Sequence, residues 1–268
     1  MIKVVFMTPL QEKIRALLAR KNAILLAHYY VRPEIQEIAD VLGDSLALAQ
    51  AAARTDAAVI VFAGVHFMAQ SAAMLSPQKT VLLPRADAGC PLADMATAES
   101  VRNMRQREPD ALFVTYINST AEVKAESDVC CTSSNAINII RSVPSSRKIV
   151  LLPDGNLARH VASATGREVI AWEGCCPIHQ ALTGEDVLAR KREHPGAPFV
   201  AHPECRPDVL ALADFIGSTS AILQFARENA AEKIIIGTEE GIFTQLKKQN
   251  PGKTFILASP GLLCADMK

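Results

Sequence analysis

The feature that most constrains the fold of this 268-residue chain is a unit that occurs three times. The segments 23–50, 111–138 and 198–225 share one plan: an apolar strand, a polar strand end, a helix, a short break, a hydroxyl residue and a second helix. Successive spacings of 88 and 86 relate four sets of residues, namely His28, Tyr116 and His202; Asp40, Asp128 and Asp214; Ser45, Ser133 and Thr219; and Lys79, Arg167 and Lys253. A repeat this regular predicts three domains of like fold.

Each unit alternates helix and strand. An amphipathic helix is expected at 11–22, 98–109 and 184–195, and a β-branched run typical of a buried parallel strand follows it. In the first and third units the next helix should begin near Pro33 and Pro207 and end at Gly43 and Gly217. Two further strands close each unit. The sequence therefore predicts an α/β protein with three homologous three-layer αβα domains, whose parallel sheets surround a pseudo-threefold axis.

The expected domains are 1–91, 92–177 and 178–268. No segment rich in Gly, Ser or Pro separates them, so tight packing is expected. Lys plus Arg equals Asp plus Glu, 28 against 28, which argues against binding to nucleic acid or to an anionic membrane. The N-terminal apolar run is too short for a signal peptide and no run of about eighteen apolar residues occurs. These features predict a cytoplasmic protein that acts on small molecules.

Polar residues stand where the first strand of each unit ends. They form the pairs His28 and Tyr30, Tyr116 and Asn118, and His202 and Glu204. Ligands of open α/β sheets bind beyond the carboxyl ends of the strands. Three hydroxyl residues, Ser45, Ser133 and Thr219, stand where new helices should begin, and there a hydroxyl can cap the helix, bind an anion together with free amides, or do both. A small polyanionic substrate is expected.

Three cysteines follow the last strand of their units: Cys90, Cys176 and Cys264. The repeat register leaves Cys175 open as an alternative to Cys176, which we prefer because it shares the dipeptide "CP" with Cys90. Three converging thiolates suit a 4Fe-4S cluster with one open iron. Zinc held by the three cysteines with water or His179 is the alternative. The other thiols, of Cys130, Cys131 and Cys205, have no counterparts in the repeat and are expected to pack in the interior.

Long motifs along nearly the whole chain resemble the quinolinate synthase family, the A protein of de novo NAD biosynthesis. They include "LAHYYVRPEIQEIADVLGDSL", "AGCPLADM", "YINSTAEVKAESDVCCTSSNA", "PDGNL", "CPIHQ", "IIIGTEEGI" and "CADMK". The resemblance implies a 4Fe-4S cluster on Cys90, Cys176 and Cys264. It also implies condensation of iminoaspartate with dihydroxyacetone phosphate to quinolinate, phosphate and water, and functional coupling to an L-aspartate oxidase or dehydrogenase.

The resemblance also implies the substrate-binding residues: His28, Ser45, Tyr116, Ile117, Asn118, Ser133, His202, Pro203, Glu204 and Thr219. Glu204, as the sole carboxylate among the strand-end residues, is the expected general base. Tyr30 and Tyr116 are expected to exchange protons with the substrate, while His28 and His202 orient its oxygens. The chain departs from the family pattern at Gln70 and Ala158, and the family continues beyond the motif that ends at Lys268.

Two other functions remain open from the sequence. One is a different 4Fe-4S hydro-lyase that acts on a hydroxy-dicarboxylate. The other is a non-enzymatic iron-sulfur protein that serves as a redox or iron sensor or as an electron carrier. An electron carrier would favour four protein ligands, and Cys175 or Cys205 could supply the fourth.

Overall fold

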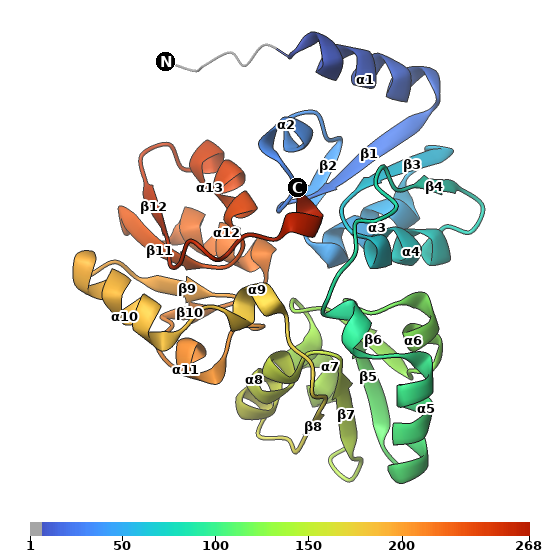
Figure 1. Ribbon diagram of the computed structural model, residues 1–268, viewed down its shortest axis with the longest axis vertical. Helices are drawn as coiled ribbons and strands as arrows, with labels where there is room; N and C mark the ends of the chain where they lie inside the picture. Colours follow the sequence, from blue (N-terminus) through green and yellow to red (C-terminus); the bar gives the residue numbers. More distant parts are fainter. Residues whose placement is uncertain (1–6) are drawn as a thin grey trace.

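The computed structural model describes residues 7–268, and it consists of three four-stranded parallel sheets with flanking helices. The strand orders are β2-β1-β3-β4, β6-β5-β7-β8 and β10-β9-β11-β12, so the three units share one topology. Figure 1 shows them as three lobes around a common centre. The expected α/β fold with three repeated domains is confirmed. The domain limits at 91 and 177 stay a prediction, and residues 1–6 of the first domain lie outside the described residues.

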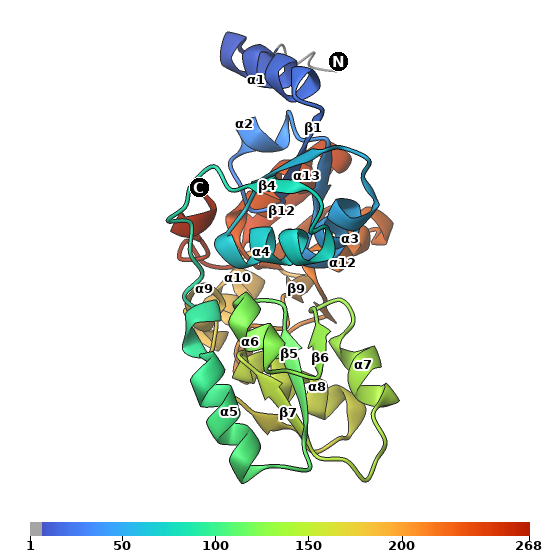
Figure 2. The same cartoon turned by 90° about the vertical axis from the view of Figure 1, so that its right-hand side faces the viewer.

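The three units share an alternation of helices and strands and differ in a few short helical turns. Figure 2 shows the molecule from the side, with α5 to α8 of the second unit at the end opposite to α1. The first contains α1 (Pro9–Arg20), β1 (Ala23–His28), α2 (Pro33–Gln36), β2 (Val41–Gly43), α3 (Ser45–Arg54), β3 (Val59–Ala63), α4 (His66–Leu75) and β4 (Thr80–Leu82). The second contains the 3-10 turn η1 (Ala93–Met95), α5 (Ala98–Arg107), β5 (Leu112–Tyr116), α6 (Ala121–Ala125), β6 (Val129–Cys131), α7 (Ala136–Ser142), β7 (Ile149–Leu152), α8 (Gly155–Thr165) and β8 (Ile170–Ala171). The third contains α9 (Pro177–Gln180), α10 (Gly184–Glu193), β9 (Phe199–Ala201), α11 (Pro207–Leu210), β10 (Phe215–Ile216), α12 (Thr219–Glu228), β11 (Lys233–Gly237), η2 (Glu240–Ile242), α13 (Phe243–Gln249), β12 (Thr254–Leu257) and η3 (Ala265–Met267).

The expected helix from Pro33 to Gly43 is wrong, and so is its counterpart that ends at Gly217. Both helices stop after four residues, and the chain then forms the edge strands β2 and β10. In the first unit Asp40 explains the change, because its Oδ2 accepts the amide of Leu25 at 2.8 Å and fixes the chain beside β1. Each unit therefore has one more strand than the sequence predicts.

The aspartates matched by the repeat hold this edge strand in all three units. Asp128 and Asp214 accept the amides of Phe113 and Phe199 at 2.8 and 2.7 Å, as Asp40 does for Leu25. The matched cations Lys79, Arg167 and Lys253 also share a role, because each donates to carbonyls at the end of a preceding helix. Residues that the repeat matches in the sequence therefore make the same contacts in the structure.

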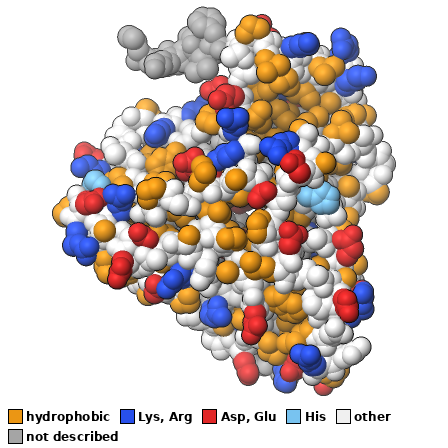
Figure 3. Space-filling model, in the orientation of Figure 1, with side chains coloured by type: hydrophobic (Ala, Val, Ile, Leu, Met, Phe, Trp, Pro, Cys, Tyr) orange, Lys and Arg blue, Asp and Glu red, His pale blue; other side chains and the backbone are white. Residues whose placement is uncertain are grey.

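One apolar core connects the three units. Its fully buried members include Leu26 of β1, Val114 of β5 and Ile236 of β11. Figure 3 shows acidic and basic side chains interspersed over one face of the molecule. Within 7–268 no helix is long and apolar enough to cross a membrane. The chain after β12 returns to the centre, where η3 lies close to the first unit.

Candidate active site

A cavity of about 340 Å³ lies where the carboxyl ends of β1, β5 and β9 meet. Residues of all three units line it, because the common topology turns these strand ends toward the same centre. Every site residue expected from the sequence lines the cavity except Pro203, which is buried beside His202. The expected residues that line it are His28, Tyr30, Ser45, Cys90, Tyr116, Ile117, Asn118, Ser133, Cys176, His202, Glu204, Thr219 and Cys264.

Two histidines at matching strand ends present the same face to the cavity. Nδ1 of His28 accepts the amide N–H of Tyr30 at 3.2 Å, and Nδ1 of His202 accepts that of Glu204 at 3.4 Å. Since an amide can only donate, each neutral imidazole carries its proton on Nε2. Burial lowers the pKa of His28 to about 4 and that of His202 to about 3. Both residues are therefore neutral hydrogen-bond donors at neutral pH.

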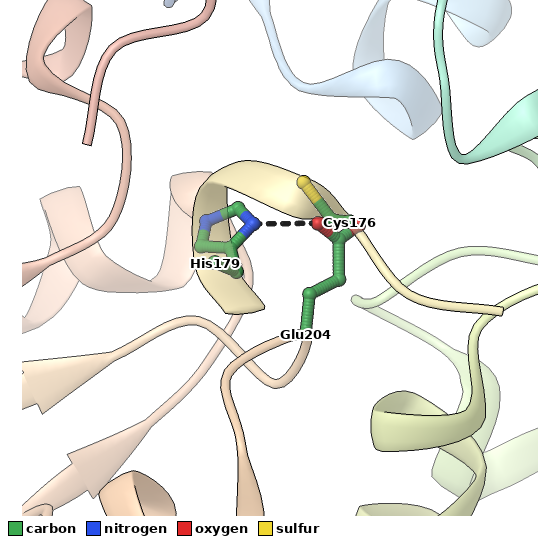
Figure 4. Close-up of side chains that lie close together, drawn as sticks. All are labelled: Cys176, His179 and Glu204. Carbon is green, nitrogen blue, oxygen red and sulfur yellow. Dashed lines mark ion pairs between the residues drawn. The ribbon is translucent and has the colours of Figure 1, made fainter. Parts of the chain in front are cut away.

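Glu204 is buried at the centre of a polar cluster. Its Oε1 accepts a hydrogen bond from the hydroxyl of Tyr116 at 2.6 Å, and the amide of Asn118 lies 3.5 Å away. Its Oε2 lies 2.7 Å from Nδ1 of His179 on α9, as Figure 4 shows, although this short contact is bent away from a linear hydrogen bond. Burial alone would raise the pKa of Glu204, but the nearby imidazoles of His202 and His179 and these hydrogen bonds hold it below its usual value. The carboxylate is ionised.

The hydroxyl residues do not cap helices as expected. Asp44 and Ser218 cap α3 and α12, so Ser45 and Thr219 are the first helical residues and their side chains face the cavity. Ser133 lies in the turn that precedes α7. The capping role is therefore wrong by one position in two units, because the residue before the hydroxyl is itself a good cap. The hydroxyls line the cavity instead, where that of Thr219 lies 2.9 Å from the hydroxyl of Tyr30.

The structure places one cysteine of each unit on the cavity wall: Cys90, Cys176 and Cys264. Cys175 does not line the cavity, and its amide instead contacts Sδ of Met95 at 3.2 Å. Burial raises the pKa of all three cavity thiols, that of Cys90 to about 12. Thiolates at these positions need a bound cation to offset the loss of water. The donor set therefore fits a metal centre.

The spacing of the donors separates two kinds of metal. Among the described residues, the one compact donor group is Cys176, His179 and Glu204, whose ligand atoms lie within 4.8 Å of one another. A single tetrahedral zinc, with Zn–S bonds of about 2.3 Å, requires its thiolates in such a compact group. The three cysteines do not form one. Their arrangement is therefore wider than that of the compact group.

Two carboxylates that the sequence reasoning missed hold the cysteine loops. The amide of Cys176 donates to Oδ2 of Asp154 at 3.3 Å, and the amide of Cys264 donates to Oε1 of Glu239 at 3.2 Å. Both acids come two residues after the last residue of β7 or β11 that pairs with the first strand of the unit. At the same place after β3 the first unit has Val65. They lie in the motifs "PDGNL" and "IIIGTEEGI", and the repeat alignment was the available signal.

The remaining thiols divide into two kinds. Cys131 and Cys205 are buried, as expected for packing residues, but Cys130 is exposed, so its expected packing role is wrong. It belongs to the edge strand β6, where alternate side chains face outward. Gln70 and Ala158, the two departures from the family pattern, do not line the cavity.

The fold and the cavity define a class of protein: an α/β protein whose central cavity lies between three repeated units, each of which contributes a cysteine loop. Comparison with known proteins narrows this class. The model of the family "Quinolinate synthetase A protein" matches residues 12–268. The chain therefore belongs to that family.

Curated relatives cover nearly all of the chain. A quinolinate synthase from a Geobacter species is 53% identical over 259 residues, which are 97% of this chain and 85% of that protein. The quinolinate synthase of Pelobacter propionicus is 55% identical over 260 residues, with the same two coverages. "Quinolinate synthase 1" of the archaeon Methanosarcina acetivorans is 50% identical over 257 residues, 96% of this chain and 84% of its own.

Proposed function

We propose that the protein is a quinolinate synthase, which condenses iminoaspartate with dihydroxyacetone phosphate to quinolinate, phosphate and water. The observation that carries this proposal is the single cavity between the three units, lined by the cysteine loops and by the polar strand ends. Both substrates are small and anionic, as the buried histidines and hydroxyls of the wall require. The imine is short-lived in water, so an enzyme that oxidises aspartate must supply it, such as an L-aspartate oxidase or dehydrogenase.

Cys90, Cys176 and Cys264 would hold a 4Fe-4S cluster. With three protein ligands, such a cluster keeps one iron open, and the open iron supplies a Lewis acid for a substrate oxygen or nitrogen. Asp154 and Glu239 accept the amides of two of these cysteines and so fix the loops that carry the ligands.

The neutral donors of the wall would bind and orient the substrates. Nε2–H of His28 and of His202 can each donate to a carboxylate or carbonyl oxygen, since Nδ1 is held by the backbone in both. Ser45 and Thr219 begin helices of ten residues, so their hydroxyls lie beside free amides that favour phosphate or carboxylate. Ser133 and Asn118 line the same cavity in the second unit.

Glu204 would act as the general base. It is ionised and buried, and Tyr116 donates to it at 2.6 Å, so the phenol oxygen can take a proton from the substrate while the phenol gives its own proton to the carboxylate. The phenols of Tyr30 and Tyr116, whose pKa values burial keeps well above 10, are neutral and can give a proton to a leaving hydroxyl or phosphate.

Anaerobic reconstitution with iron and sulfide tests the proposal. The loaded protein should form quinolinate from dihydroxyacetone phosphate with oxaloacetate and ammonia, which generate the imine, and no quinolinate should form without the triose phosphate. Dehydration of a hydroxy-dicarboxylate without triose phosphate would favour a different hydro-lyase. A cluster whose spectrum ignores substrate analogues, together with no quinolinate, would favour an iron-sulfur sensor and overturn the proposal.

A further inference from the structure

A compact group of three metal-binding side chains is part of the cavity wall: Cys176, His179 and Glu204. Cys176 comes directly before α9, His179 lies within this helix, and Glu204 follows β9. Their ligand atoms lie within 4.8 Å of one another, and Figure 4 shows the three side chains next to each other. The proposed function uses Cys176 and Glu204 in separate roles and gives His179 none.

His179 is the member of this group that lacks a satisfactory partner. Its side chain is buried, and its Nδ1 lies 2.7 Å from Oε2 of Glu204, but this contact is too bent to satisfy Nδ1 as a hydrogen bond. A buried polar atom without a hydrogen-bond partner is unfavourable. A cation bound by Nδ1, by the carboxylate and by the sulfur of Cys176 would give Nδ1 the partner that it lacks.

Neighbouring groups hold two of the donors in an orientation that suits a metal ion. Nε2 of His179 lies 2.9 Å from the hydroxyl oxygen of Thr238, which can accept its proton when Nδ1 binds the ion. Tyr116 donates to Oε1 of Glu204 at 2.6 Å and leaves Oε2 for the ion. Such hydrogen bonds to the ligands fix their orientation and raise the affinity for metal.

We propose that Cys176, His179 and Glu204 form a mononuclear zinc site in the cluster-free protein. One thiolate, one imidazole and one carboxylate suit Zn²⁺, with water as the fourth ligand. The two anionic ligands neutralise the charge of the ion, as a buried site requires. Tetrahedral zinc bonds of about 2.0 to 2.3 Å place neighbouring donors roughly 3.3 to 3.6 Å apart. Nδ1 and Oε2 must therefore separate from 2.7 Å, and the sulfur must approach from at most 4.8 Å.

The zinc site and the iron-sulfur cluster exclude each other, because both require Cys176. This consequence rests on the proposed function, whereas the zinc site itself does not. Zinc would also bind Glu204, the proposed general base, so the zinc-loaded protein should be inactive. His179 is not a ligand of the proposed cluster, and its loss should therefore affect zinc and leave the cluster in place.

Substitution of the donors distinguishes this site from one made by the three cavity cysteines. In cluster-free protein, His179→Gln and Cys176→Ser should each weaken Zn²⁺ binding by more than about 10²-fold, measured by competition with a chromogenic chelator. Cys90→Ser and Cys264→Ser are the matched controls, because they remove thiols of the same cavity wall, and their Zn²⁺ affinity should change by less than about threefold. Unchanged affinity in His179→Gln, or an equal loss in the controls, would overturn the proposal.

X-ray absorption at the zinc edge decides the question even if His179→Gln does not fold. Zinc in the unsubstituted, cluster-free protein should show one sulfur at about 2.3 Å and nitrogen or oxygen ligands at about 2.0 Å, and two or more sulfurs would overturn the proposal.

Reconstitution in the presence of zinc tests the competition for Cys176. Zn²⁺ added with iron and sulfide should reduce iron uptake several-fold in the unsubstituted protein and leave that of His179→Gln nearly unchanged. Equal reduction in both proteins would contradict the role of His179. Failure of the unsubstituted protein to take up a cluster without zinc, while zinc still shows one sulfur ligand, would refute the proposed function alone.

Discussion

Replacement of Glu204 by glutamine removes the negative charge of the side chain and keeps its shape, so it tests the role of the charge alone. Glutamine can still accept from Tyr116 through its oxygen, while its amide faces Nδ1 of His179. The hydrogen bond from Tyr116 at 2.6 Å becomes a neutral one, which is weaker than one to a charged group by about 1 kcal/mol. Relief from burying the carboxylate offsets part of this loss. We expect a change in unfolding free energy below about 2 kcal/mol.

Catalysis should respond far more strongly than stability. Loss of a general base lowers kcat by about 10²- to 10⁴-fold. Quinolinate formation should therefore nearly stop in Glu204→Gln, with iron content and thermal unfolding close to those of the unsubstituted protein. Glu99→Gln, at an exposed position in the first turn of α5, is the matched control. Turnover within about threefold of the control would refute the assignment of Glu204 as the base.

Three further predictions follow from the cavity wall. Cys176→Ser should prevent retention of iron in reconstituted protein and Cys175→Ser should not, because only Cys176 lines the cavity; the reverse result would move the ligand by one residue. Asp154→Asn and Glu239→Gln should retain the fold but release iron to a chelator several-fold faster, which loss of the cluster absorbance would measure. An unchanged rate of release would mean that Asp154 and Glu239 do not hold the cysteine loops. Between about pH 6.5 and about pH 4, His28 should lower the unfolding free energy by about 3 kcal/mol, because the unfolded chain binds a proton at His28 that the buried imidazole refuses. The buried His202 adds to this loss, so His28→Gln should remove only the part of the pH dependence that is due to His28, and an unchanged slope would contradict the burial argument.

The architecture was predictable because the residues that reveal the repeat also make the same hydrogen bonds in each unit. Asp40, Asp128 and Asp214 each accept the amide of the first strand, so their spacing in sequence is the spacing of the units. The edge strands β2, β6 and β10 were not predictable. They are two or three residues long and are defined by pairing with a neighbour, whereas their apolar residues also satisfy the helical spacing after Pro33 and Pro207.

The candidate site was predictable as a set of strand ends but not as a network. The repeat indicates that His28, Tyr116 and His202 point to one centre, and they line one cavity. It does not indicate which side chains bond to one another across units. The contact of Thr238 with Tyr30 joins residues 208 positions apart and depends on how the first unit packs on the third.

Equivalent positions in the three units hold side chains of different chemical type. A repeat in the sequence predicts where these positions lie but not what the differences do. Two residues after the last paired residue of β7 and β11, the second and third units have Asp154 and Glu239. The first unit has Val65 at the same place after β3. A third acid would add another negative charge beside Glu204, and Lys268 already pairs with Glu239 at 2.8 Å. The first unit holds its loop through a backbone hydrogen bond from the amide N–H of His66 to the carbonyl of Ala88 instead. The repeated fold therefore sets where the loops converge, and the departures from symmetry set the charge of the cavity.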